Sequence, residues 1–579
     1  MAWYDEAVFY HIYPLGLAGA PKQNDYGEPV HRLNTLLPWV DHIKEIGGSA
    51  LYIGPLFESV GHGYETTDYK KLDSRLGTNE DLTAFVAYCH EQGIKVIFDG
   101  VFNHTGRDFF AFKDIQANRE NSHYKDWYCN VNFWGNNEYN DGFSYDNWGG
   151  YNLLVKLNQK NPAVVDYICD VIRFWVSEFD VDGIRLDAAD VLDFDFMKAL
   201  RRTANEVKPD FWLMGEVIHG DYSRWVNGET LHSVTNYTLH KALYSGHNDH
   251  NYFEIAHTVR RLQNMGTLKL YNFVDNHDVE RIYTKLTNKA HFAPVHVLLY
   301  TLPGVPSIYY GSEFGIEGRK EYGSDDSLRP ALNIEDYKDS VKTNPCTALI
   351  AALGKVRQAV PALSYGSYDE LMLTNRQFAY ARDLDGTRVI VSVNNDDAPA
   401  GMHLAAGNCT AYIGALSGEK VSVQDGHINI TQPANSGEIW VPEGTDLDVK
   451  PVKVVTKTES EAKTNTENKA ASETSTDAKG NQESEPKIES KDTVAATESA
   501  DAKKNTTDTE KNTAADTPVD PETITVDWSK SPESMTVPEL QAAILAKLAG
   551  NGPVDAQMKK TVTDNIWHDS LVNWLKSFR

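Results

Sequence analysis

Short apolar runs alternate with amphipathic stretches from residue 1 to about residue 365. Helical patterns separate the runs, and the clearest spans 161–179, where Asn161 suits the cap, Pro162 suits the first helical position and apolar residues share one face. Eight strands alternating with helices predict a (β/α)8 TIM barrel. A doubly wound open sheet is the rival, disfavoured because no G-x-G-x-x-G follows the first strand. The predicted strands are 8–14, 50–57, 95–104, 183–187, 211–217, 233–237, 270–278 and 306–311.

One insertion breaks the alternation of strands and helices within the predicted catalytic barrel, residues 1–367. Residues 105–155 follow the third strand and are dense in Trp, Tyr, Asn, Asp and Gly. So long an excursion in a compact domain is more often functional than a plain loop. We expect some of its aromatic side chains to stack on sugar rings and others to form a small core of their own.

The pattern changes after the barrel. Residues 368–447 show short alternating strands, with Asp385-Gly386 at a hairpin turn, and predict an antiparallel β domain. Residues 448–527 are rich in Thr, Lys, Glu, Ala and Ser and contain no aromatic residue, a composition that cannot build a core and predicts a disordered linker.

A small helical module is predicted for residues 528–579. Its first helix has a capping box of Thr536 and Glu539 and an apolar stripe of leucine and isoleucine; a second contains Ile566, Trp567, Leu571 and Trp574. A self-packed helical hairpin and an element that docks a protein partner or a glycan both remain open.

Composition narrows the function classes. The 579 residues carry 55 Lys and Arg against 82 Asp and Glu, a net charge of −27, which disfavours nucleic acid and anionic membranes as partners. No secretion signal and no transmembrane segment is apparent, and the five scattered cysteines suit free thiols in a reducing compartment, so we expect a cytoplasmic protein.

Charged residues interrupt the apolar run GIRLDAAD at 183–190. Arg185 and Asp187 alternate with Ile184 and Leu186, although an unpaired buried charge costs several kcal/mol. In a (β/α)8 barrel the C-terminal ends of all strands face one cleft, which would hold such charges. The strand ends and the loop after the second strand deliver Asp99, Asn103, His104, Arg185, Asp187, Glu216, Asp275, His277 and Asp278, with His62, Tyr64 and Asp68.

Three carboxylates on three different strands suit acid/base chemistry, and a pair across a glycosidic bond is the usual equipment of glycoside hydrolysis. Asp187 lies beside a cation, which favours the ionised form that a nucleophile needs. Glu216 follows the apolar FWLM, where partial desolvation raises a pKa and suits a proton donor. Asp278 would stabilise the positive charge of the oxocarbenium-like transition state.

The segments DGVFNH (99–104), GIRLDAAD (183–190), MGEV (214–217) and FVDNHD (273–278) resemble the conserved regions of the alpha-amylase family of glycoside hydrolases, family 13. The eighth-strand segment PGVPSIYYGSEFG (303–315) also resembles that family, and the match covers residues 3–447. The resemblance implies a retaining mechanism on α-glucosidic bonds, with 105–155 as domain B and 368–447 as domain C. It implies Asp187 as nucleophile, Glu216 as acid/base and Asp278 as transition-state stabiliser, and substrate-binding roles for Tyr64, Asp68, His104, Arg185 and His277.

Departures from the family pattern refine the expected substrate. Asp190 and Val191 stand where typical alpha-amylases carry Lys-His, which argues against endo-acting starch cleavage. LLVKLNQKNP (153–162) is similar to a segment of the neopullulanase and cyclomaltodextrinase branch, although that branch's usual N-terminal domain does not precede the first barrel strand here. We expect an enzyme of maltodextrins, cyclodextrins or starch-derived oligosaccharides.

Two alternatives share these residues. A transglycosylase would use the same covalent intermediate, and the three intact carboxylates argue against a non-catalytic glycan-binding or scaffold protein. The chemistry itself requires no cofactor. Asn103 matches a ligand position of calcium-binding family members, so a structural calcium ion is an option that the sequence leaves open.

Overall fold

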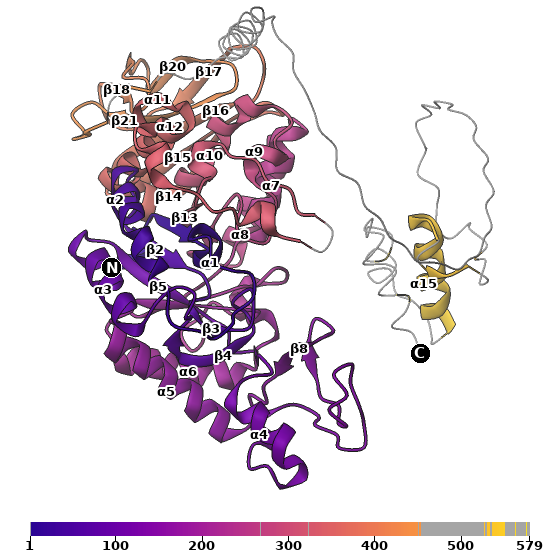
Figure 1. The fold of residues 1–579 in the computed structure, drawn as a ribbon. Coiled ribbons are helices and arrows are strands. Elements are labelled where there is room, and N and C mark those ends of the chain that lie inside the picture. Colours follow the sequence, from indigo (N-terminus) through magenta and orange to yellow (C-terminus); the bar gives the residue numbers. More distant parts are fainter. Residues whose placement is uncertain are drawn as a thin grey trace, which may run out of the picture. The chain divides into compact units, whose positions relative to one another are not determined.

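The computed structural model describes residues 2–266, 268–321, 324–449, 451–452, 526, 530–532, 535–550, 562 and 575. The chain divides into two compact units, residues 1–477 and 478–579. In the first, domain C lies at one end and the domain B elements α4 and β8 lie at the other (Figure 1).

The predicted (β/α)8 barrel is confirmed. Eight strands form one sheet in the order β11-β10-β9-β5-β2-β1-β13-β12, and every pair is parallel. A parallel bridge between Thr235 and Tyr271 joins β11 to β12 and closes the ring. The strands are β1 (Phe9–Ile12), β2 (Ala50–Ile53), β5 (Lys95–Gly100), β9 (Gly183–Leu186), β10 (Trp212–Gly215), β11 (Ser233–Val234), β12 (Tyr271–Asn272) and β13 (Val305–Tyr309).

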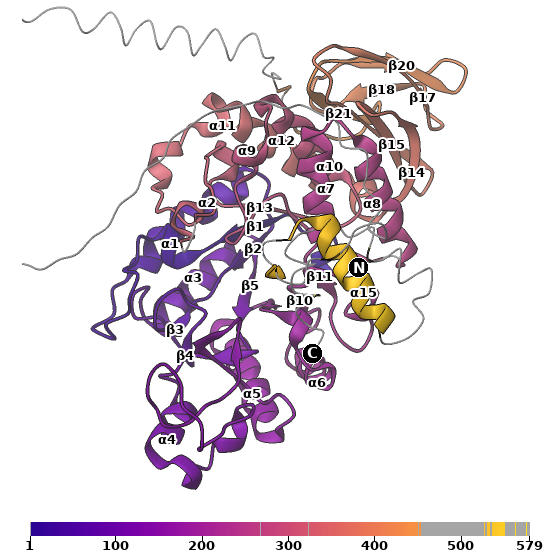
Figure 2. The ribbon, with the colours of Figure 1, turned by 90° about the vertical axis from the view of Figure 1, so that its right-hand side faces the viewer.

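Helices surround this ring (Figure 2). The prediction at 161–179 is confirmed, because α5 begins at Pro162 and the Asn161 side chain accepts from Ala163 N. The longer helices are α2 (Leu37–Glu45), α3 (Asn79–Glu91), α5 (Pro162–Phe179), α6 (Phe194–Val207), α7 (Tyr237–Asn248), α8 (Tyr252–Asn264), α10 (Phe292–Thr301) and α12 (Pro345–Ala359), and the short ones are α1 (Pro14–Leu17), α9 (Ile282–Lys285), α11 (Ser340–Thr343) and α13 (Ala362–Tyr365).

Strand alternation separates two cores. Side chains of one parity fill the inside of the barrel, among them Phe9, Tyr52 and Trp212. Those of the other parity, such as Tyr10 and Leu51, pack outward in the main core. The interior stays apolar toward the N-terminal ends of the strands, which leaves polar inward positions for their C-terminal ends.

Two of the predicted strands are each split in two. The run at 50–57 forms β2 and then β3 (Phe57–Ser59), which pairs with β4 (Thr66–Leu72), and the run at 95–104 forms β5 and then β6 (His104–Thr105). In both cases the second piece leaves the barrel for a smaller antiparallel sheet. Continuous apolar runs do not reveal that change of partner.

The region after the third strand has an aromatic core of its own. Helix α4 (Phe110–Asn118) packs near a sheet of β6, β8 (Tyr151–Lys156) and β7 (Asn147–Trp148). Six of its thirteen aromatic side chains are buried together, which is the structural role expected for part of them; they are Phe109, Phe112, Trp127, Tyr128, Phe143 and Tyr145. Trp134 is 98% exposed and Tyr151 is 68% exposed. Exposed aromatic side chains such as these are the ones available to stack on sugars.

The C-terminal part of the first unit is antiparallel, as predicted. Asp385 and Gly386 both have positive φ in the hairpin between β15 and β16, which suits a two-residue turn of type I′. The strands are β14 (Ser367–Leu373), β15 (Gln377–Leu384), β16 (Thr387–Asn394), β17 (Ala400–Ala405), β18 (Ala411–Gly414), β19 (Lys420–Ser422), β20 (His427–Gln432) and β21 (Ser436–Pro442).

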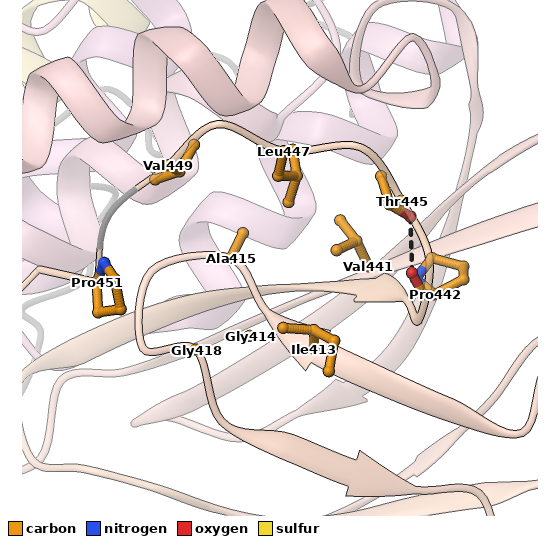
Figure 3. Close-up of a pocket in the computed structure, with 10 residues that line it drawn as sticks. All are labelled: Ile413, Gly414, Ala415, Gly418, Val441, Pro442, Thr445, Leu447, Val449 and Pro451. Atoms are coloured by element: carbon orange, nitrogen blue, oxygen red, sulfur yellow. Dashed lines mark hydrogen bonds between the residues drawn. The ribbon is translucent and has the colours of Figure 1, made fainter.

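After β21 the chain folds back over this domain. Thr445 Oγ1 donates to Pro442 O at 2.7 Å, and Val452 N donates to Leu416 O at 2.8 Å. Leu447 and Val449 cover a small apolar cavity of about 160 Å³ beside β18 and β21 (Figure 3). The residues expected to form a linker lie almost entirely outside the described residues.

In the second unit, α15 (Val537–Gly550) begins at the predicted cap. Thr536 N and Oγ1 donate to Glu539 Oε2 at 2.7 and 3.0 Å. Leu540, Ile544 and Leu545 are buried in a cluster that includes Val562 and Leu575. The apolar stripe therefore packs within the module, while the second predicted helix lies outside the described residues.

Candidate active site

Arg185 and Asp187, the first two charges in GIRLDAAD, lie on the inward face of the barrel. Arg185 on β9 pairs in register with Asp99 on β5 and with Met214 on β10. Asp187 directly follows β9, and Glu216 directly follows β10. The backbone N of Glu216 donates to Leu186 O at 2.9 Å. Because inward positions recur every second residue, 185 and 187 project to the same side near the C-terminal strand ends.

Arg185 binds three carboxylates at once. Its Nη1 donates to Asp99 Oδ1 at 2.8 Å and to Asp187 Oδ1 at 2.9 Å, and its Nη2 lies 2.9 Å from Glu216 Oε2. The arginine is 3% exposed, so these bonds compensate for the loss of hydration of its charge. The guanidinium therefore holds Asp187 and Glu216 side by side.

Asp99 forms the floor of this cluster. Its Oδ2 accepts from Tyr52 OH at 2.8 Å and from Tyr64 OH at 3.1 Å. Tyr64 OH also lies 2.5 Å from His277 Nε2. These hydroxyls link Asp99 and Arg185 to the strand end that carries Asp278.

Asp278 approaches the cluster from the segment after β12. Its Oδ2 lies 3.1 Å from His277 Nε2, and its Oδ1 lies 2.9 Å from Arg329 Nη2. The side chain is 34% exposed, against 16% for Glu216 and 10% for Asp187. Asp278 is thus the most solvent-accessible of the three carboxyl groups, and Asp187 is the most buried.

The backbone after Asp187 orients Glu216. Ala188 adopts a left-handed conformation, with φ 47° and ψ 43°, which an alanine rarely occupies. In this conformation Ala188 N donates to Glu216 Oε2 at 3.1 Å. One oxygen of Glu216 is therefore fixed by Arg185 and by a backbone N–H.

The buried carboxyl groups compete for ionisation. Burial raises the pKa of Glu216, with Asp278 and Asp99 adding to the rise and Arg185 opposing it. Burial also raises the pKa of Asp187, and the charge of Glu216 adds to that rise against Arg185. Two neighbouring carboxyls of this kind titrate as a coupled pair, because the charge on one disfavours ionisation of the other.

His104 and His277 lie beside the cluster as neutral rings. Burial lowers the pKa of His104 to about 4, and burial together with Arg329 and Arg185 lowers the pKa of His277. His104 Nε2 lies 3.1 Å from Tyr64 O. The structure thus brings seven of the expected residues together: Asp187, Glu216, Asp278, Tyr64, His104, Arg185 and His277.

Asp68 is the exception, and its expected place in the cluster is corrected. Along β4, Tyr69 points inward and its hydroxyl donates to Val101 O at 2.6 Å, so the neighbouring Asp68 points out. The Asp68 side chain is exposed, and its Oδ1 accepts from Lys70 N at 2.8 Å. It lines a shallow surface groove with Lys71 and Asp108.

Asn103 is buried, and both ends of its side-chain amide face groups of the protein. Its Oδ1 already accepts from the amide of Gln159 at 3.4 Å, and its Nδ2 faces His104. An amide oxygen has a second lone pair, so a calcium ion bound by Asn103 stays a prediction. Among the described residues no group of three or more His, Cys, Asp or Glu is arranged to hold a metal.

Arg329 belongs to the site although no sequence motif pointed to it. Its Nε donates to His277 O at 3.0 Å, its Nη2 binds Asp278 and Asp325, and its guanidinium lies 4.7 Å from the Tyr13 ring centroid. It comes from the segment after β13, with no motif around it. Only the folded chain shows that this arginine holds Asp278.

Replacing Arg329 by lysine tests that role. A lysine keeps the charge but lacks the planar fork whose Nε and Nη2 bond to His277 O and Asp278 at fixed positions, so we expect kcat/KM on an α-glucan to fall about 10- to 100-fold. Steady-state kinetics measures this, and Arg319→Lys, at an exposed position nearby, serves as the matched control. Equal kinetics in both variants would show that Arg329 does not position Asp278.

No helix among the described residues is both long and apolar enough to cross a bilayer. The five cysteines are all free thiols. None of the five thiols is part of the carboxylate cluster.

Comparisons with known proteins agree with this geometry. Residues 31–355 match the family model described as alpha amylase, catalytic domain. A cyclomaltodextrinase from a Bacillus species is 31% identical over 422 residues, covering 69% of this chain and 74% of that protein. Neopullulanase 2 from Thermoactinomyces vulgaris is 29% identical over 473 residues, covering 76% and 78%.

A solved structure supports the same assignment. The structure of a cyclomaltodextrinase superposes with a TM-score of 0.68 at 27% identity, covering 76% of this chain and 78% of that one. The family model, these relatives and the carboxylate cluster in a closed barrel all indicate the same family. The chain belongs to the alpha-amylase family of glycoside hydrolases.

Proposed function

We propose that this enzyme hydrolyses α-glucosidic bonds of maltodextrins and cyclodextrins with retention of configuration, through a covalent glycosyl-enzyme. The observation that carries the proposal is the shared guanidinium of Arg185, which binds Asp187 and Glu216 at 2.9 Å each. A retaining glycosidase needs two carboxyl groups about 5–5.5 Å apart on either side of the scissile bond. A pair held on one guanidinium supports that short separation.

In the first step Asp187 attacks the anomeric carbon and the bond to the leaving oxygen breaks. Glu216 gives its proton to that oxygen, so the departing sugar leaves as a neutral alcohol. In the second step Glu216, now ionised, takes a proton from water as the water oxygen attacks the same carbon. Asp187 is released as a carboxylate, and Glu216 regains its proton.

The surrounding residues hold the reacting sugar. Asp278 carries negative charge where the oxocarbenium-like transition state develops positive charge. Tyr64 offers a ring face for stacking, and the neutral ring of His277 can donate a hydrogen bond to a sugar hydroxyl. The Nε2 of His104 instead faces Tyr64 O, so His104 supports the residue that stacks. Arg185 keeps Asp187 ionised once the proton lies on Glu216.

The substrate class is inferred from the relatives and from two side chains. The relatives reported above are named for cyclomaltodextrins and pullulan, and Val191 and Ile218 are exposed near the ends of β9 and β10. An apolar side chain at 191 offers no polar grip on the leaving sugar of a long chain. This favours short or cyclic dextrins over starch.

A substrate panel tests the proposal. We expect purified enzyme to open β-cyclodextrin and cleave maltotriose with kcat/KM about tenfold or more above that for soluble starch, per glucosidic bond. Reducing-sugar release and chromatography of products measure this, with β-linked cellobiose as the control substrate. Failure to release sugar from every α-linked substrate would overturn the proposal, and longer products at high maltotriose would indicate transfer instead of hydrolysis.

A further inference from the structure

We propose that Gln159 is a positioning residue that acts through Asn103 to fix which ring nitrogen of His104 carries the proton. Gln159 follows β8, in the segment that leads from domain B to α5. Asn103 lies between β5 and β6, and both side chains are buried. The two amides and the imidazole form one chain of hydrogen bonds.

The chain of hydrogen bonds starts at a backbone N–H, which can only donate. The backbone N–H of Asp193, the N-cap residue of α6, donates to Gln159 Oε1 at 2.6 Å. A backbone N–H has no lone pair to offer, so the amide oxygen of Gln159 must face it. The amide nitrogen of Gln159 therefore faces Asn103 Oδ1, at 3.4 Å.

The orientation of Asn103 follows from that of Gln159. With Oδ1 accepting from Gln159, the amide nitrogen Nδ2 faces His104 Nδ1 at 3.2 Å. An amide nitrogen only donates, so Nδ1 must accept and carries no proton. In the neutral ring the proton then lies on Nε2, which donates to Tyr64 O at 3.1 Å.

The chain of hydrogen bonds ends beside the carboxylate cluster of the active site. The carbonyl that receives the proton of His104 belongs to Tyr64, whose hydroxyl contacts Asp99 and His277. Because Nδ1 accepts from Asn103 Nδ2, the ring carries one proton and is neutral. Three segments distant in sequence, at residues 103, 159 and 193, are thus joined by uncharged groups at the position where the resemblance placed a cation.

Nitrogen NMR of the full-length protein tests the tautomer directly. In protein labelled with ¹⁵N-histidine, we expect His104 to show a protonated Nε2 and an unprotonated Nδ1, with the signals assigned by their loss in His104→Asn. In Gln159→Glu the carboxylate cannot donate to Asn103. The Asn103 amide should then reverse and present Oδ1 to the ring, moving the proton to Nδ1.

The kinetic consequence rests on the proposed function, whereas the tautomer does not. We expect Gln159→Glu to lower kcat/KM on β-cyclodextrin about tenfold. Gln432→Glu is the matched control, because Gln432 is a buried amide in domain C bonded on both sides, to Ser392 and Ser436. It should leave the His104 signals and kcat/KM unchanged.

Two results would overturn the proposal. One is a protonated Nδ1 on His104 in the wild-type protein. The other is an unchanged tautomer in both Gln159→Glu and Gln159→Leu, the second variant being neutral and close in size so that a folded form is available. An altered tautomer with unaltered kinetics would remove the positioning role, and a wild-type enzyme inactive on α-glucans would reject the proposed function while leaving the NMR result to stand.

Discussion

Asp187→Asn is expected to lower kcat on β-cyclodextrin by about four orders of magnitude or more, the scale seen when a covalent nucleophile is removed. An amide cannot ionise and does not attack the anomeric carbon, yet it has nearly the volume of the carboxylate and its oxygen can still accept from Arg185. The fold should therefore persist. Steady-state kinetics with thermal unfolding of the same sample separates loss of chemistry from loss of structure.

Asp68→Asn is the matched control for that experiment. The same change is made at an aspartate that is exposed and whose Oδ1 accepts from Lys70 N within its own hairpin. We expect its kcat/KM to stay within about twofold of wild type, as for most surface substitutions. A loss at Asp68 comparable to that at Asp187 would contradict the placement of Asp68 outside the site.

Glu216→Gln is expected to give the second large loss, about 10²- to 10⁴-fold in kcat/KM on maltotriose, the usual contribution of a general acid. The loss should nearly vanish for an α-glucosyl substrate whose leaving group is a strong acid, because such a group departs without a proton. Rates on the two substrates, measured side by side, distinguish an acid/base from a residue that only binds.

The pH profile gives an independent check on Glu216. Burial raises the pKa of this carboxyl, and only its protonated form can act as the acid. Activity of the wild type should therefore fall as the pH rises through that pKa, which forms the basic limb of the profile of kcat/KM. Glu216→Gln should lack this limb, and a limb that persists in the variant would assign it to another group.

Local patterns were sufficient to predict the barrel. Apolar runs every few tens of residues gave the eight strands, and Asn161-Pro162 gave the start of α5. The period of two along β9 explains why Arg185 and Asp187 share a face, and closure of the barrel then brings them to Glu216. These inferences need only periodicity and the fact that parallel strands end at one mouth.

Features that depend on a distant partner were not predictable. Arg329 and Gln159 act through atoms far away in the sequence, and no spacing rule links them to residue 278 or 103. Asp68 was misplaced because a motif match does not say to which side a strand residue points. The left-handed conformation of Ala188 was also not predictable, because an alanine in a sequence does not indicate a positive φ.

The central claim is that Asp187 forms a covalent bond to the sugar. An α-glucosyl fluoride with a second fluorine on the ring slows breakdown of the glycosyl-enzyme more than its formation, so the intermediate can be isolated, digested and mapped by mass spectrometry. The account predicts that the added sugar lies on Asp187. A sugar found on Glu216 or Asp278, or inverted product with no covalent species, would contradict it.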